Sequence, residues 1–162
     1  MGIMNASRFE SPRFPTNNVD IVKRYRFYSN VAAFLGTVAR LDGTFDTFIT
    51  QSPYATGRLI RARRDISVRV YDAQVRDFVH PQELADVLDA DASCADLEFS
   101  LSYSYLNERY DKIPFKGDVF LMRAAIEADV LTLKIYLEDG LGRTEGGMLA
   151  YMVADVLRRY MR

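Results

Sequence analysis

A glycine-rich stretch is the first place in this sequence where residue type and spacing could serve chemistry. Glycines stand at positions 140, 142, 146 and 147, between a predicted strand and a predicted helix, where a phosphate-cradling loop would lie. However, Glu145 occupies the place of the third glycine of the dinucleotide motif, and the Gly-Lys-Ser/Thr of the Walker motif does not occur. The stretch is therefore interpreted as a flexible turn between strand and helix.

A second stretch resembles the start of a calcium-binding loop. Asp89, Asp91 and Ser93 have the alternate spacing of its first ligands, but Cys94 replaces the required glycine and Ser100 occupies the position of the final glutamate. We interpret this segment as an acidic loop that ends a helix, with no calcium bound.

His80 and Cys94 are the strongest transition-metal ligands in the sequence. One histidine and one cysteine cannot form a tetrahedral zinc site, and no pattern pairs them as base and nucleophile. The nucleophile motif G-x-S-x-G does not occur, and no pair of carboxylates is singled out by its spacing. We therefore expect no catalytic residues, no metal and no cofactor, and a protein that is not an enzyme.

Arginines and tyrosines mark the one stretch that could bind a macromolecule. Six arginines lie between residues 58 and 76, whereas residues 77–98 contain seven acidic residues and no lysine or arginine. Such segregation can make complementary surfaces on neighbouring subunits, although two ordinary solvated faces would give the same pattern. The chain has 17 arginines, 4 lysines and 10 tyrosines, a bias that favours protein contacts. The residues proposed for this surface are Arg61, Arg63, Arg64, Arg69 and Tyr71.

Nucleic acid is the second candidate partner of this basic stretch. Arginines with aromatic neighbours on a sheet face can bind nucleic acid by charge and stacking. The pI near 5.9 argues against a specialised binder, because such domains are usually basic overall. Protein contact is therefore the preferred interpretation.

A meander of three antiparallel strands is predicted over residues 97–137. From Leu97 to Tyr105 apolar and polar residues alternate without exception, which indicates one buried and one exposed face. Two further strands follow at 119–127 and 130–137, joined by a tight turn at Ala128 and Asp129.

Earlier residues are predicted to add helices and strands to this meander. Apolar residues at steps of three and four predict a helix over 19–41, although a strand near 21–28 followed by a helix capped by Asn30 fits the same residues. Strands are predicted at 44–50, 58–63 and 66–71, and a short helix at 81–89.

The helix predicted over residues 144–161 has an uninterrupted apolar stripe. Thr144 can cap it and Arg158 and Arg159 suit its carboxyl end. The fold predicted from these elements is α+β: an antiparallel sheet of five to six strands with a C-terminal meander, covered by the C-terminal amphipathic helix and flanked by two further helices.

Residues 1–18 form an N-terminal arm in this prediction, and residues 19–162 a single domain. The arm contains two prolines and no regular period, so it cannot form a core of its own. We expect it to gain order on a neighbouring subunit, with Phe9 and Phe14 as anchors supported by Arg8 and Arg13.

These features favour a non-catalytic subunit of a larger protein assembly, such as a virion. Its partners would be other protein subunits in a homo- or hetero-oligomer. The element order is also similar to small secretion-chaperone folds, and that resemblance implies a dimeric binder of unfolded clients as an alternative. The sequence has no signal-peptide run and no stretch that could span a bilayer, so we expect a protein that is cytoplasmic or assembled in the cytoplasm.

Overall fold

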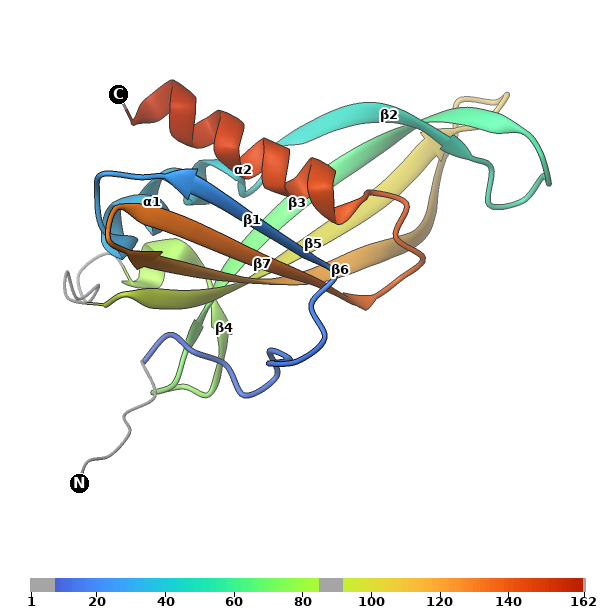
Figure 1. Ribbon diagram of the computed structural model, residues 1–162. Helices are drawn as coiled ribbons and strands as arrows, with labels where there is room; N and C mark the ends of the chain where they lie inside the picture. Colours follow the sequence, from blue (N-terminus) through green and yellow to red (C-terminus); the bar gives the residue numbers. More distant parts are fainter. Residues whose placement is uncertain (1–7, 85–91, 162) are drawn as a thin grey trace.

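One curled antiparallel sheet dominates the fold. The computed structural model describes residues 8–84 and 92–161, of which 47% lie in strands and 20% in helices. The elements are β1 (Ile21–Arg26), α1 (Val31–Val38), η1 (Ala39–Leu41), β2 (Phe45–Gln51), β3 (Leu59–Asp72), β4 (Asp77–Val79), η2 (Pro81–Leu84), β5 (Cys94–Leu106), β6 (Lys112–Glu127), β7 (Val130–Asp139) and α2 (Gly146–Tyr160). The sheet order is β1-β7-β6-β5-β3-β2, and β4 pairs with the end of β3 (Figure 1).

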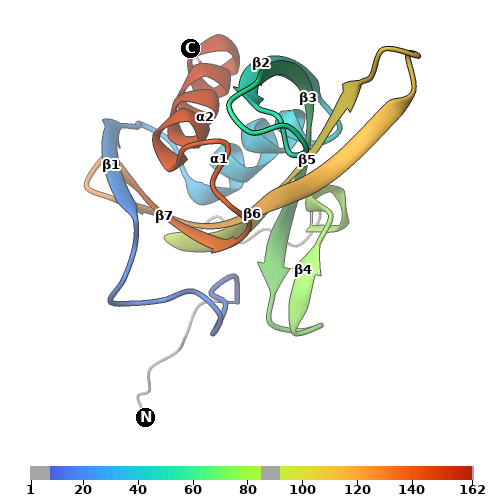
Figure 2. The same ribbon diagram turned by 90° about the vertical axis from the view of Figure 1, so that its right-hand side faces the viewer.

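The sheet curls into a half-barrel around the two α-helices (Figure 2). Its central strands are long enough for twist to accumulate, and the β5–β6 ladder shifts register between Leu101 and Tyr103. Gly117 lies opposite this bulge, where a Cβ would be 2.3 Å from the Leu101 carbonyl oxygen. The close approach therefore requires glycine at this bend.

The predicted sheet of five to six strands covered by three helices is wrong. The sheet has seven strands. Ile21–Arg26 is a strand that pairs with β7 and not the start of a helix, and β4 is a strand that the sequence does not predict. The strands predicted at 58–63 and 66–71 do not pair as a hairpin, because they form the single continuous strand β3. Helix α1 begins only after Asn30, whose Oδ1 accepts a hydrogen bond from the Ala33 N–H at 2.8 Å. The spacing of apolar residues across 21–28 mimics a helix, but the cap separates strand from helix. The helix predicted over 81–89 is a four-residue 3₁₀ helix at Pro81–Leu84, and the rest of that range lies outside the described residues.

The predicted meander is confirmed as β5, β6 and β7. These strands pair in sequence order and extend beyond the predicted ranges. Ala128 and Asp129 form the tight turn between β6 and β7. Both residues have positive φ, which is required in a two-residue hairpin turn whose twist matches that of the strands.

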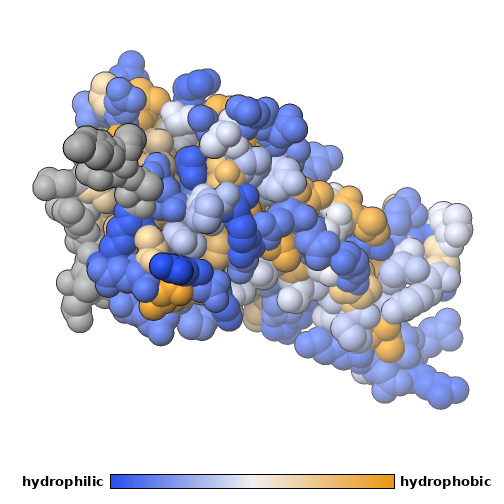
Figure 3. All heavy atoms as spheres, turned by 90° about the horizontal axis from the view of Figure 1, so that it is seen from below, coloured by the Kyte–Doolittle hydropathy of each residue, from blue (hydrophilic) through white to orange (hydrophobic). Residues whose placement is uncertain are grey.

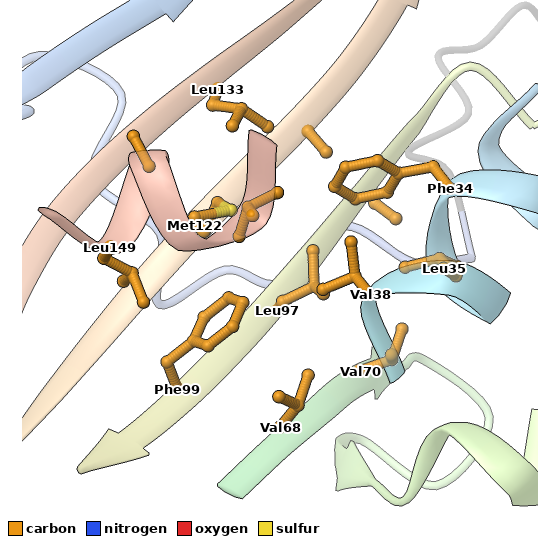
Figure 4. Packing of buried hydrophobic residues seen from close by; sticks show 14 of the residues in the cluster. Phe34, Leu35, Val38, Val68, Val70, Leu97, Phe99, Met122, Leu133 and Leu149 are labelled. Carbon is orange, nitrogen blue, oxygen red and sulfur yellow. The ribbon is translucent and has the colours of Figure 1, made fainter. Parts of the chain in front are cut away.

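The main core lies between the concave face of the sheet and the helices (Figure 4). Leu97 and Phe99 of β5, both fully buried, point towards Val38 of α1 and Leu149 of α2. Helix α2 contributes the predicted face in part: Val153 is fully buried, whereas Met148 is exposed. None of the helices that the structure describes is both long and apolar enough to cross a membrane.

A smaller core lies on the convex face. Its buried members come from the N-terminal segment, β3, β4 and β6: Phe14, Tyr71, Phe78 and Leu121. Because strand residues alternate between faces, the two cores use neighbouring positions of the same strands.

Candidate protein-protein interface

The glycine-rich loop between β7 and α2 binds an anion that the chain itself supplies. The backbone N–H of Gly142 lies 2.8 Å from Asp118 Oδ1, and that of Thr144 lies 3.3 Å from Asp118 Oδ2. Gly140 has φ +107°, and a Cβ there would be 2.2 Å from the same carboxylate. The Asp118 carboxylate therefore already accepts hydrogen bonds from the backbone N–H groups that a bound phosphate would need.

A chain of hydrogen bonds anchors this loop to the sheet. Arg64 Nη1 donates to the Thr144 hydroxyl at 2.7 Å, and that hydroxyl lies 2.9 Å from the Tyr103 hydroxyl. Tyr103 in turn donates to Asp118, and burial beside this carboxylate raises the pKa of Tyr103. Arg64 also forms a bidentate pair with Asp46. Its buried guanidinium is therefore a structural crosslink on the concave side, and the Thr144 side chain is used here instead of capping α2.

The predicted metal-ligand candidates do not assemble in the part of the chain that is described. Within residues 8–84 and 92–161 no group of three or more potential ligands of the kinds His, Cys, Asp and Glu could hold a metal ion. The Cys94 thiol is buried, and burial raises its pKa to about 12, so it is protonated at neutral pH. Asp89 and Asp91, which resemble the first ligands of a calcium-binding loop in the sequence, lie outside the described residues.

The arm residues Arg8–Phe14 form a segment that we call the outer strap. It begins beside the end of β3 and the start of β5, where the Ala73 and Asp96 N–H groups donate to the carbonyl oxygens of Arg8 and Phe9, and it continues across the convex face. Phe9 is 1% exposed and belongs to the main core, while Phe14 is 4% exposed and belongs to the convex core. The N–H of Ser11 donates to the buried Asp96, which also forms a bidentate pair with Arg123. Both predicted anchors therefore pack against this chain's own sheet.

Arginines of the outer strap form ion pairs with the same sheet. Arg8 makes a bidentate pair with Asp72, at 2.8 and 3.1 Å. Arg13 bridges Glu98 of β5 and Glu138 of β7. These pairs orient the strap across β3, β5 and β7.

The Arg8–Asp72 pair makes a pH-dependent prediction. The hydrogen bond that Arg8 donates to Asp72 lowers the pKa of this carboxyl group by more than burial raises it. The folded state therefore favours the ionised carboxylate. The pair should therefore stabilise the fold at neutral pH, and this contribution should disappear as pH falls below the ordinary aspartate pKa towards the lowered folded value. We expect Asp72→Asn to be less stable than wild type at pH 7 and to lose less stability between pH 5 and 3, measured by urea unfolding. Equal pH slopes for the two proteins would contradict the ion pair.

The β2–β3 and β5–β6 hairpins project beyond the helices (Figure 1), and residues of both hairpins line a groove of about 1080 Å³. We call it the distal groove, and its rim carries aromatic, aliphatic and cationic side chains: Tyr54, Arg58, Arg61, Arg63, Leu106 and Arg109. Register places Arg61 beside Ile49 and Arg63 beside Thr47 on the convex face of the sheet. The two hairpins thus bring segments some fifty residues apart to one surface.

Large apolar side chains are unusually exposed around the distal groove. Tyr54 is 69% exposed, Leu59 61% and Leu106 62%, and Tyr110 at the tip of the second hairpin is 82% exposed. Seen from below, hydrophobic residues lie in separate spots among hydrophilic ones on this projecting end (Figure 3). Aromatics interspersed with arginines are typical of the centres of protein interfaces.

The structure divides the predicted interface residues into three groups. Arg61, Arg63 and Arg69 are exposed on the convex face. Tyr71 lies on the same face but is buried with Phe78, at a ring separation of 5.4 Å. The remaining five are held within the chain's own structure, as described above for Arg8, Phe9, Arg13, Phe14 and Arg64.

Sequence reasoning missed the contribution of the β5–β6 loop to the distal groove. Leu106, Arg109 and Lys112 line it, yet they follow Arg76, the last arginine of the basic stretch, by thirty residues or more. The alternating pattern ends at Tyr105 and gives no signal for these residues, because their place at the groove depends on how β5 pairs with β3 and β6.

Comparison with known proteins gives no relative. No family model, no curated protein and no solved structure matches the chain.

Proposed function

We propose that this protein is a non-catalytic structural subunit of a larger protein assembly, of the virion type or similar, and that the distal groove is its docking surface. The observation that carries the proposal is the collection of exposed aromatic and aliphatic side chains beside arginines on two projecting hairpins. Burying such residues in a partner is favourable by about 25 cal/mol per Å² of apolar surface. We place its assembly in the cytoplasm.

The charges of the distal groove support a partner with acidic groups. In the described part of the chain no carboxylate lies within 4.0 Å of the guanidinium groups of Arg58, Arg61 or Arg109, whereas Arg63 is paired with Asp65. Arg63 also stacks on the ring of Phe45, its guanidinium carbon 3.8 Å from the ring centroid. Arg61 donates a hydrogen bond of 3.5 Å to the Thr47 hydroxyl, and the other donors of these three arginines can make bidentate contacts with carboxylates of a partner.

The same arginines support nucleic acid as a second candidate partner. Tyr54 and Tyr105 lie with their rings 6.5 Å apart at the groove, and such rings can stack on bases. Glu108 and Asp111 also line the groove, so its charge is mixed and suits a protein surface better than the uniform negative charge of a phosphate backbone. A protein partner is therefore preferred.

Charge reversal in the distal groove is expected to remove the partner. The double variant Arg58→Glu, Arg61→Glu should reduce incorporation into the parent assembly at least tenfold, because it replaces two attractive contacts by repulsive ones. Affinity purification of the tagged chain from its source cells, followed by quantitative mass spectrometry, measures this incorporation. Both positions are exposed, so the melting temperature should change little.

Arg24→Glu is the matched control, because it reverses an exposed arginine on β1 at the opposite edge of the sheet. Equal incorporation of the double variant and the control would contradict docking at the distal groove. Salt-dependent retention of wild type on DNA or RNA, lost in the double variant, would instead identify nucleic acid as the partner.

A further inference from the structure

Strand β2 has an open edge whose hydrogen-bonding groups can be assigned from its register. The Ser52 N–H donates to the Arg58 carbonyl at 2.7 Å, and the Ile66 N–H donates to the Thr44 carbonyl at 2.9 Å. Since bonded pairs alternate along an antiparallel ladder, the even-numbered residues of β2 bond to β3. The peptide groups of Phe45, Thr47 and Ile49 therefore point away from the sheet, and among the described strands only β3 pairs with β2.

This edge lacks the features that protect sheet edges. Its residues Phe45–Gln51 include no proline, glycine, lysine or arginine, and Phe45 and Ile49 are 59% and 56% exposed. The opposite edge, β1, carries a lysine and two arginines in six residues. Charged residues therefore protect the β1 edge against pairing with another strand, whereas the β2 edge lacks this protection and can accept one.

The groups at the end of β2 restrict how a second strand can align. The Gln51 carbonyl oxygen already accepts a hydrogen bond from Arg143 at 2.6 Å, and Pro53 has no N–H. The pairing must therefore use Phe45, Thr47 and Ile49 and be centred on Thr47.

A second copy of β2 fits this alignment. In antiparallel pairing about Thr47, Phe45 of one copy faces Ile49 of the other, and the two Thr47 residues face each other. Aromatic with β-branched residues and threonine with threonine are favourable cross-strand pairs. Asp46 faces Phe48 of the other copy, so no two like charges are opposed.

We infer that two copies of this chain associate through their β2 edges, in antiparallel register about Thr47, to form one continuous sheet. The pairing adds about six backbone hydrogen bonds and brings the exposed side chains of Phe45 and Ile49 into cross-strand contact. This inference deepens the proposed function, on which it rests for its biological purpose. Phe45 and Thr47 also line the distal groove, so the dimer would join the distal grooves of its two copies at the paired edges.

Purified wild-type protein tests the pairing by sedimentation equilibrium between 1 and 100 μM. We expect a dimer that dissociates within this range, and at least a tenfold higher dissociation constant for Thr47→Pro. Proline at position 47 removes an outward N–H and leaves the bonds of β2 to β3 in place. Arg24→Pro is the matched control, because the Phe27 N–H bond to Asp129 places the Arg24 peptide group on the open side of β1.

A charge-pair rescue distinguishes a second copy from any other strand. Phe45→Lys alone should weaken the dimer at least tenfold by removing both Phe45–Ile49 pairs. Adding Ile49→Glu in the same chain should restore it, because each new lysine then faces a glutamate of the other copy.

A wild type that is monomeric at 100 μM would overturn the inference, as would a dimer unaffected by Thr47→Pro or a double variant without rescue. If the dimer forms as described but the distal-groove variant still enters the assembly, the proposed function fails and the inference stands. If partners bind the groove of a monomer, the inference fails and the proposed function stands.

Discussion

The variant Val153→Asp should not fold. Val153 is fully buried in the middle of α2, against the concave face of the sheet. An unpaired carboxylate there costs several kcal/mol, comparable to the whole stability of a domain. We expect a protein that is insoluble or shows no cooperative thermal transition by circular dichroism.

Met148→Asp is the control on the same helix, because Met148 is 47% exposed. This variant should melt within a few degrees of wild type. A wild-type melting temperature for Val153→Asp would show that α2 does not dock on the sheet as described.

Removing the outer strap should also destabilise the fold strongly. Phe9→Ala alone is expected to cost about 3–5 kcal/mol, because it empties a fully enclosed site in the main core. Deletion of residues 2–18 should cost more, since Asp96 would lose its bond from Ser11 and the sheet would lose Phe14. Urea unfolding measures both changes.

Tyr28→Ala is the comparison for Phe9→Ala, because Tyr28 is an aromatic residue of the same domain that is 72% exposed. Its free energy of unfolding should change by less than about 1 kcal/mol. If deletion of residues 2–18 left stability unchanged, the strap would not belong to this chain's core, and the sequence-based expectation that another subunit orders it would regain support.

The sequence is most informative where a single face of an element is buried. Alternation over 97–105 predicts β5 because residues on its inner face, such as Leu97 and Phe99, are enclosed by both helices. The apolar stripe predicts α2 for the same reason. In both cases one contact surface determines the pattern of residues.

Prediction fails where the partner of a residue is distant in sequence. β1 is an edge strand held on one side by β7, so its residues lack full alternation and suggest a helix. Phe9 has no local pattern, because its neighbours in the core come from elements far along the chain. The register shift opposite Gly117 also has no periodic signal in the sequence, because it appears only when β5 and β6 are paired.

The candidate surface was predictable in part. Alternation along the continuous strand β3 places Arg61, Arg63 and Arg69 on one face and Arg64 on the other, whereas the sequence predicts two separate strands at 58–63 and 66–71. Arg64 is buried because it lies on the enclosed inner face of β3. Its guanidinium group donates hydrogen bonds to Asp46 and Thr144 there. The contribution of Leu106 and Arg109 could not be inferred, because it requires the register of β3 with β5.

The native size of the protein in an unfractionated extract of its source cells tests the central proposal most directly. Size-exclusion chromatography with immunodetection measures it without purification or concentration. We predict that the chain elutes with a species many times larger than its own 18.5 kDa, and that Arg58→Glu, Arg61→Glu shifts it to the size of the free protein. Elution of wild type only as a free monomer or dimer would contradict the proposal that it is an assembly subunit.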